Sequence, residues 1–233
     1  MATALAQPIV ADSPAERGAP TPAAALVLAR EAAVVFASLL DRLHPSWVRA
    51  VGIDLAVTTP GHCAVWIEAI TSRFDLRWPD LSAARSALEL LWLLPPAEVQ
   101  RVCIARALFA CREPLARCVD GQVRRRAREL VGAPAYEALA ALPAPRGGGL
   151  PLPADVDSES LGLDGWQLLD QATEWRDSRA RRLVQLMLPL SGVPSPKFKP
   201  SAAEHALFVL QLPHLFPEHA WLFGFNPARC ISG

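Results

Sequence analysis

Apolar residues recur at helical spacing along most of the chain, most densely between residues 81 and 131. The positions that carry this pattern are Leu88, Leu91, Trp92, Val99, Val102, Cys103, Ala107, Leu108 and Cys111. Their spacing follows the period of an α-helix and not the alternation of a strand. Prolines divide the stretch and predict helices over 81–94, about 96–112 and 122–131, with Glu113-Pro114 interrupting after the second. The stretch is apolar on one side and rich in arginine on the other, which favours packing or docking over catalysis.

The same spacing predicts further helices before and after this stretch. They cover residues 23–43, about 63–74 and 164–188, with one or two more turns over 135–142. A last helix starts after Ser201, and Pro213 and Pro217 are expected to end it. In the last long helix, Ala203, Leu207 and Leu210 are expected to face inward. Residues 46–59 mix alternation with β-branched side chains and predict either a short strand or an irregular packed stretch. The predicted fold class is mainly α, a compact multi-helix domain with irregular, proline-rich connections.

The longest predicted helix spans residues 164–188. Acidic residues crowd its first half and arginines its second half, an arrangement that complements the helix macrodipole. Asp177 and Arg181 are four residues apart, so we expect them to form an ion pair along the helix.

Proline and glycine mark the expected boundaries of the chain. Residues 1–22 are small, polar and interrupted by prolines, which is typical of a flexible tail. Residues 143–160 contain the run PAPRGGGLPLP and predict a linker or loop. This linker would separate a helical N-terminal part, residues 23–142, from a helical C-terminal part, residues 161–233, which we expect to pack on the first.

Composition and charge exclude several classes of protein. With 52% hydrophobic residues, the 233-residue chain can bury a sizeable core without disulfides. Its 23 basic and 23 acidic residues balance, so no overall charge favours nucleic acid or an acidic membrane. The five cysteines are scattered without CxxC pairs, which fits a reducing, cytoplasmic setting. Since neither an export signal nor an apolar run of about 20 residues is present, we expect neither export nor direct membrane insertion.

Catalytic and metal-binding motifs are absent from the sequence. It has no HExxH, CxxC or GxSxG motif, and its GGG run lacks the Lys-Ser/Thr of a phosphate loop. The histidines follow no metal-ligand spacing, so structural or surface roles are favoured for His62, His205, His214 and His219. Core packing is favoured for Cys103, Cys111 and Cys118. We therefore expect a protein that is not an enzyme and has neither a metal site nor a cofactor.

Residues 117–128 carry the strongest local charge. The basic residues there are Arg117, Arg124, Arg125, Arg126 and Arg128. Such a run can bind nucleic acid, form a solvated helix face, or dock an acidic protein surface whose carboxylates pair with the guanidinium forks. The balanced total charge and the lack of interleaved aromatic residues count against nucleic acid. The other two interpretations stay open.

Short phrases follow one another in a characteristic order between about residue 26 and residue 223. They are Leu43–Trp47 (LHPSW), Leu93–Pro95, Arg101-Val102, Arg106–Leu108, Leu115–Gly121 and Ala220–Phe223. In order and spacing, these phrases resemble the SctK/YscK family of type III secretion proteins, including its plant-pathogen HrpB-type branch.

The resemblance implies an accessory subunit of the cytoplasmic sorting platform. Such a subunit bridges the SctD-type ring of the inner membrane to pods built of SctQ-type protein, with SctL and the SctN ATPase below them. Family members are not enzymes and bind no known cofactor. The implied location is cytoplasmic, peripheral to the inner membrane at the secretion apparatus.

The arginine run and the aromatic C-terminal segment supply the candidate interface residues. The face expected to meet an acidic partner surface contains Arg117, Arg124, Arg125 and Arg128. Trp221 and Phe223 are expected to pack the C-terminal segment onto the core, although an exposed Trp221 would instead belong to an interface.

Two alternative functions remain. A helical nucleic-acid-binding or regulatory protein would be retained on polyanions and lose this retention as salt rises. A secretion chaperone would bind an effector through an apolar groove, and would usually be smaller and more acidic than this chain.

Overall fold

The computed structural model describes most of the chain between residues 22 and 223. The described ranges are 22–52, 60–77, 79, 81, 86–143, 150–152, 156–173, 175, 177–190 and 201–223. Within these ranges every regular element is a helix, so the predicted mainly α fold class is confirmed. The predicted tail before Pro22 and most of the predicted linker lie outside the described residues.

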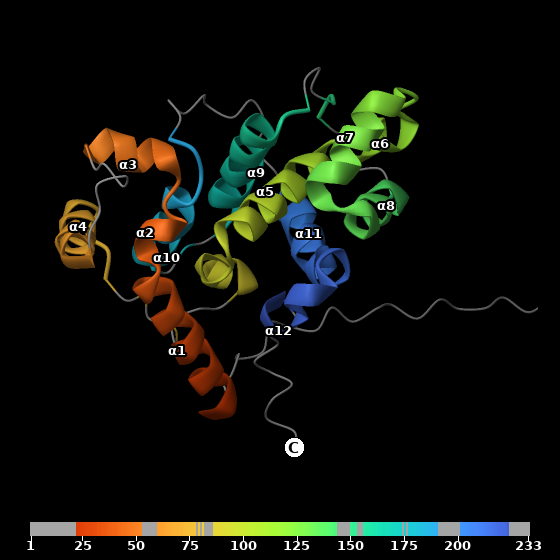
Figure 1. Cartoon of the computed structure of the whole chain (residues 1–233). Coiled ribbons are helices and arrows are strands. Elements are labelled where there is room, and N and C mark those ends of the chain that lie inside the picture. Colours follow the sequence, from red (N-terminus) through yellow and green to blue (C-terminus); the bar gives the residue numbers. More distant parts are fainter. Residues whose placement is uncertain are drawn as a thin grey trace, which may run out of the picture.

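Helix α5 (Pro96–Ala110) runs through the middle of the molecule (Figure 1). Proline stands at its start, close to the predicted residue 96, and Glu98 lies in its first turn, where the helix dipole favours a carboxylate. Every residue from 102 to 110 is buried, as in a helix that other elements enclose on all sides. Helix α9 (Ser158–Ala172) packs along α5, with Gly165 at their closest approach.

Three short helices and α11 cover one side of α5. They are α6 (Arg112–Arg117), α7 (Gly121–Val131), α8 (Ala133–Ala141) and α11 (Ala202–Leu215). Asp120 caps α7, because its carboxylate accepts a hydrogen bond of 2.7 Å from the backbone N–H of Gln122. Gly132 ends α7 with a φ of +86°, a conformation that side-chain-bearing residues rarely adopt, and so turns the chain into α8.

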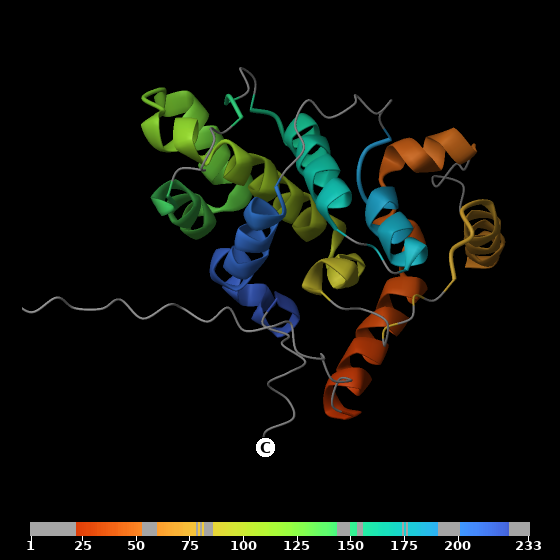
Figure 2. The ribbon, with the colours of Figure 1, turned by 180° about the vertical axis from the view of Figure 1, so that it is seen from behind.

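The N-terminal helices gather on the other side of the molecule together with α10 (Figures 1 and 2). They are α1 (Pro22–Ala37), α2 (Leu39–Arg42), α3 (Pro45–Val51), α4 (Pro60–Arg73) and α10 (Ser178–Leu186). The 3₁₀ helix η2 (Ala87–Leu93) joins this group to the rest, since its buried side chains lie among α1, α10 and α12 (Ala220–Phe223). Helices α1 and α2 correspond to the predicted helix 23–43, and α4 corresponds to the predicted helix 63–74.

Hydrogen bonds around α10 join segments that are far apart in the sequence. The backbone N–H of His44 donates to the carbonyl of Leu186 at 2.9 Å, and the indole N–H of Trp47 donates to the carbonyl of Leu188 at 2.9 Å. A continuous hydrophobic core extends from α1 to α12. The division of the chain into two parts at residues 143–160 stays a prediction.

The predicted single helix over 164–188 is wrong, because the chain breaks there into α9 and α10. Thr173 ends α9 in an extended conformation, and Asp177 caps α10 by accepting a 2.9 Å hydrogen bond from the backbone N–H two residues later. This capping replaces the predicted ion pair with Arg181, which pairs with Asp170 across the break instead. The break lets α10 turn back onto η2.

Residues 45–51 form helix α3, so neither a strand nor an irregular stretch is correct for this part of 46–59. Pro45 occupies the first helical position, where its missing N–H is not needed. His44 caps the helix, since its Nδ1 accepts a 3.3 Å hydrogen bond from the N–H of Ser46. Residues 53–59 lie outside the described residues.

The predicted α-helix over 81–94 is present as the 3₁₀ helix η2, with residues 82–85 outside the described ranges. Ser86 and Glu89 form a capping box at its start, in which the N–H of Ser86 donates to the Glu89 carboxylate at 3.1 Å. The tighter helix buries the whole run from Leu88 to Leu93, which an amphipathic α-helix would expose in part.

Two prolines do not end helices where the sequence predicts. The chain breaks at Cys111, and Pro114 lies in the first turn of α6, where proline is tolerated. Pro213 lies inside α11, which continues to Leu215 and stops before Pro217.

The predicted inward face of α11 is also wrong. Ala203 and Leu210 are exposed, Leu210 by 69%, and Leu207 is half-buried. The buried residues of α11 are Phe208, Leu212 and Leu215. Phe208 sets this face, because its ring packs edge-on against that of Phe109 with 5.3 Å between centroids.

Candidate interaction surfaces

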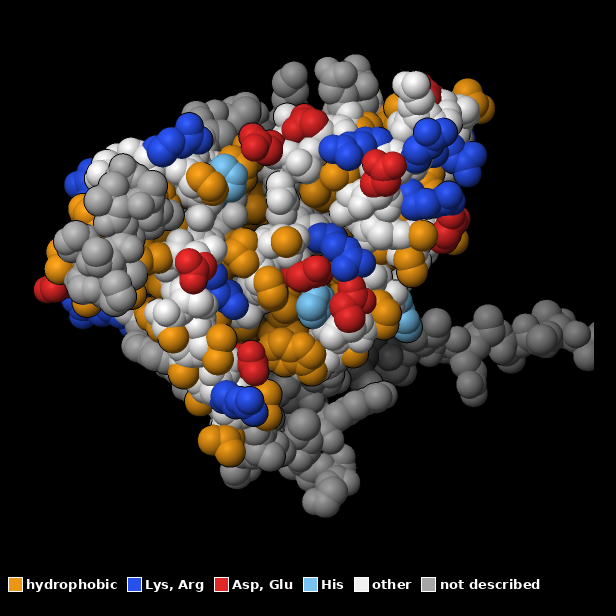
Figure 3. Space-filling model, viewed as in Figure 1, with side chains coloured by type: hydrophobic (Ala, Val, Ile, Leu, Met, Phe, Trp, Pro, Cys, Tyr) orange, Lys and Arg blue, Asp and Glu red, His pale blue; other side chains and the backbone are white. Residues whose placement is uncertain are grey.

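Helices α6, α7 and α8 carry the arginine-rich surface predicted from the sequence. Ala127 and Val131 are the buried residues of α7, so its arginines point outward. We call the five exposed arginines of this region the arginine face: Arg117, Arg124, Arg125, Arg126 and Arg128. Figure 3 shows basic side chains gathered over α6–α8 with acidic side chains among them.

Local carboxylates neutralise much of the arginine face. The ion pairs are Arg117–Glu113 at 3.1 Å, Arg126–Glu129 at 3.4 Å and Arg128–Glu137. With Asp120, four carboxylates on these helices stand against the five arginines. The region is therefore close to neutral as a whole, which suits a polyanion such as nucleic acid poorly.

The available positive charge of the arginine face belongs to Arg124 and Arg125. Neither forms an ion pair with a carboxylate in the part of the chain that the structure describes. A hydrogen bond with Tyr136 raises the pKa of the Arg124 guanidinium. The guanidinium of Arg128 lies over the same ring, 5.3 Å from its centroid. Val119 is 96% exposed at the α6–α7 turn, so an apolar side chain accompanies these two charges.

The described C-terminal segment places its two predicted aromatic residues differently. Phe223 is 8% exposed, and its ring centroid lies 6.0 Å from that of Phe216. Trp221 is 42% exposed. The packing role expected of both residues fits the position of Phe223, whereas Trp221 is placed where a partner could reach it.

Replacing Trp221 with alanine is expected to lower the free energy of unfolding by no more than about 1 kcal/mol, because the residue is already 42% exposed to solvent. The matched variant Phe223→Ala should lose about 3 kcal/mol, because it opens a cavity beside Phe216. Urea unfolding of both variants measures the difference. If Trp221→Ala loses as much as Phe223→Ala, Trp221 is a packing residue and leaves the candidate interface.

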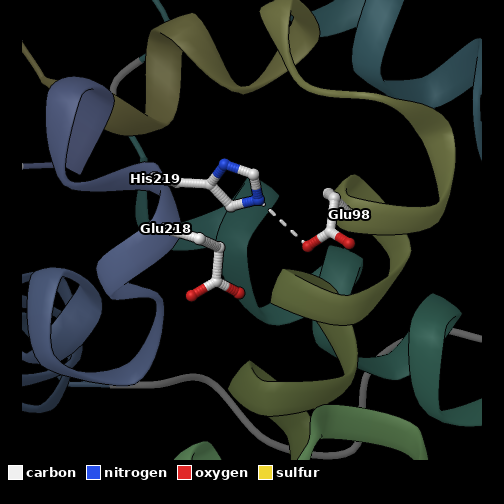
Figure 4. A group of neighbouring side chains, drawn as sticks. All are labelled: Glu98, Glu218 and His219. Atoms are coloured by element: carbon white, nitrogen blue, oxygen red, sulfur yellow. Dashed lines mark hydrogen bonds and ion pairs between the residues drawn. The ribbon is translucent and has the colours of Figure 1, made fainter.

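Glu98, Glu218 and His219 point toward one another and bring three possible metal ligands together (Figure 4). Their ligand atoms lie within 4.8 Å of one another, and His219 Nε2 lies 3.0 Å from Glu98 Oε2. The guanidinium of Arg101 contacts both carboxylates, at 3.1 Å for Glu98 and 2.6 Å for Glu218. Because Arg101 already supplies the positive charge, the cluster works as an ion-pair network that fastens η3 (Pro217–His219) to α5.

Two of the three cysteines predicted to pack in the core are buried. Burial raises the pKa of the Cys103 and Cys111 thiols, that of Cys111 to about 11, so both stay protonated and unreactive at neutral pH. Cys118 is only half-buried, at the end of α6. The side chains of the His62-Cys63 pair lie outside the described residues.

Two buried arginines are not among the predicted site residues. Arg106 and Arg112 lie where α5 and α6 meet α11, and each is 1% exposed. Arg112 donates two hydrogen bonds to Glu204, at 2.8 and 2.7 Å, and a third, at 2.8 Å, to the carbonyl of Pro143. Arg106 makes no hydrogen bond within the described residues. Its position four residues after Val102, inside the apolar run of α5, is the sequence signal that marks it as buried.

Comparison with known proteins adds a family to this geometry. A family model described as bacterial type III secretion protein (HrpB4) matches residues 18–218, which include α1 to α11 and the whole arginine face. Comparisons with curated proteins and with solved structures give no match. Among the helices that the structure describes, none is both long enough and apolar enough to cross a membrane.

Proposed function

Since the chain belongs to the HrpB4 family of bacterial type III secretion proteins, we propose that it is a non-enzymatic adaptor subunit of the cytoplasmic sorting platform. The match over residues 18–218 carries this proposal and confirms the family that the sequence resembles. In the proposed role the protein links the SctD-type inner-membrane ring to the SctQ-type pods, and through the pods meets SctL and the SctN ATPase indirectly. It would act on the cytoplasmic side, peripheral to the inner membrane.

The arginine face supports a protein partner in this role. Arg124 and Arg125 offer guanidinium groups that form no ion pair with a described carboxylate, and Val119, exposed at the turn before α7, adds an apolar side chain to the same region. The near-neutral balance of α6–α8 favours a partner with a few placed carboxylates over an extended polyanion. We therefore expect the arginine face to meet an acidic surface of one platform subunit.

Co-purification tests the adaptor role. The tagged full-length chain is expressed with the SctQ-type subunit, or with the cytoplasmic domain of the SctD-type subunit, from the same organism. A stable complex with either supports the adaptor. Failure of both, together with retention on a polyanion column that salt abolishes, would replace it with the nucleic-acid-binding function.

Reversing the charge of Arg124 and Arg125 together to glutamate is expected to weaken the complex at least tenfold, about 1.4 kcal/mol, without unfolding the monomer. Both side chains are exposed, and the contact with the core that is lost is the hydrogen bond between Arg124 and Tyr136. The melting temperature should therefore fall by no more than about 4 °C, the effect of losing one hydrogen bond. Titration calorimetry with the co-purifying subunit measures the affinity, and circular dichroism measures the melting temperature.

The matched control reverses two exposed arginines on the opposite side of the molecule, Arg49 on α3 and Arg73 on α4. It makes the same change in net charge without touching the arginine face. An affinity that falls equally in both double variants would show a general charge effect, and an unchanged affinity for the Arg124 and Arg125 variant would remove the arginine face from the interface.

A further inference from the structure

Arg106 and Arg112 are equally buried but differ in their hydrogen bonds. Both guanidinium groups stack on Phe109, at 5.5 Å for Arg106 and 4.2 Å for Arg112. Arg112 has Glu204 and two backbone carbonyls as acceptors. Arg106 has only ring faces, those of Phe109 and of Phe208 at 5.4 Å. A buried cation without hydrogen bonds is strongly unfavourable, and native proteins seldom keep one without a use.

The two unbonded atoms of Arg106 are those through which an arginine can donate a pair of parallel hydrogen bonds to a carboxylate. Its Nε and Nη2 are both buried and both without a partner. The same pair of atoms in Arg179 holds both oxygens of Asp177, at 2.8 and 2.9 Å. Arg181 holds Asp170 in the same way. The free edge of Arg106 therefore has the geometry that this chain uses elsewhere to bind a carboxylate.

The buried cluster of Arg106, Arg112 and Glu204 has a net charge of about +1, which one further carboxylate would neutralise. Two guanidinium groups share the single carboxylate of Glu204, and Arg112 already holds both of its oxygens. Burial lowers the pKa of Arg106 to about 10, so it stays charged at neutral pH. A monovalent anion with two oxygens would neutralise the cluster, whereas a phosphate dianion would leave an excess of negative charge beside Glu204.

His205 on α11 lies close enough to Arg106 to feel its charge, and its ring also has an unbonded nitrogen. Its Nδ1 is buried without a hydrogen bond, and burial, with the nearby charge of Arg106, lowers its pKa. The neutral imidazole can therefore accept or donate one hydrogen bond through Nδ1.

We propose that the Nε–Nη2 edge of Arg106, with His205 of α11 within reach of its charge, is the receptor for an aspartate or glutamate side chain of a partner protein that binds against α11. The inference rests on the proposed function in that the partner is a subunit of the same apparatus. The orphan charge destabilises the isolated chain and is compensated when the partner's carboxylate binds. A partner that places a carboxylate at Arg106 is therefore favoured over one that does not, because only the former supplies the hydrogen bonds that Arg106 lacks in the free protein.

The variants Arg106→Met and Arg112→Met test this receptor in the full-length chain. Arg106→Met should leave the melting temperature unchanged or raise it, because it removes an uncompensated buried charge, while the affinity for the co-purifying subunit falls at least tenfold. Arg112→Met, the control, should lower the melting temperature, because it leaves Glu204 unpaired. A melting temperature that falls as far in Arg106→Met as in Arg112→Met, or an affinity that does not change, would overturn the proposal.

A second measurement needs no variant and no partner. Acetate, a free carboxylate, is titrated into the isolated protein, and the Nε–H signal of Arg106 is followed by nitrogen-15 NMR. A saturating shift of this signal, absent in Arg106→Met, supports the receptor even if the adaptor role fails; no shift up to molar acetate would overturn it. A shift without any effect of Arg106→Met on partner affinity would assign the site to a small carboxylate and overturn the partner claim.

Discussion

The variant Gly165→Ala is expected to destabilise the protein by more than about 4 kcal/mol, which is most of the stability of a typical domain. A methyl group at this position would lie 1.7 Å from the carbonyl oxygen of Cys103 and 2.5 Å from its carbonyl carbon. These are backbone atoms of α5, so no side chain can move aside. The helices α5 and α9 would have to separate, which would expose the centre of the core. Far-UV circular dichroism and urea unfolding should show a loosely folded or insoluble chain.

Gly162→Ala supplies the matched control on the same helix. A methyl group there would meet only Gln100 Cγ, at 3.3 Å, and this flexible side chain can shift. Alanine also favours the helix by about 1 kcal/mol over glycine, so the stability should change by less than about 1 kcal/mol. If both alanine variants were equally stable, the close approach of α5 and α9 would be wrong.

The sequence predicts the existence of most helices because local signals determine them. Pro96 and Glu98 mark the start of α5, and Asp120 and Gly132 mark the two ends of α7. Long-range packing determines the features that it misses. No local pattern distinguishes Gly165, which meets the backbone of another helix, from a glycine that simply weakens a helix.

The break between α9 and α10 shows how a local signal can be misleading. Asp177 could lie inside a helix and pair with Arg181 four residues later, or it could cap the start of a new helix. The local sequence is compatible with both. The packing of α10 on η2 decides it, because a straight helix over 164–188 could not reach that element.

The charge of the arginine face could be predicted only in part. The run of arginines is evident from the sequence, but its balance depends on which carboxylates face it. Glu137 reaches Arg128 only because Gly132 turns α8 back alongside α7. The free charge of Arg124 and Arg125 therefore emerges only from the fold.

Arg112→Met is expected to lower the free energy of unfolding by about 3–5 kcal/mol, the range for removing one partner of a buried ion pair. The change leaves the Glu204 carboxylate without the group that holds both of its oxygens. It also removes the hydrogen bonds that Arg112 donates to the carbonyl oxygens of Phe109 and Pro143. Urea unfolding at pH 7 measures the loss, and a loss under about 1 kcal/mol would show that solvent replaces Arg112.

The pH dependence of stability provides a second test of the same pair. The hydrogen bonds from Arg112 hold the pKa of Glu204 below its ordinary value of 4.5. A carboxylate with a lowered folded-state pKa stabilises the protein above its unfolded-state pKa, and this contribution is lost as the pH falls through the folded-state value. The unchanged protein should therefore lose stability as the pH falls below about 4.5, and Arg112→Met should lose less over the same interval. Urea midpoints measured from pH 7 to pH 3 compare the two, and parallel curves would show that other carboxylates, and not Glu204, carry the acid sensitivity.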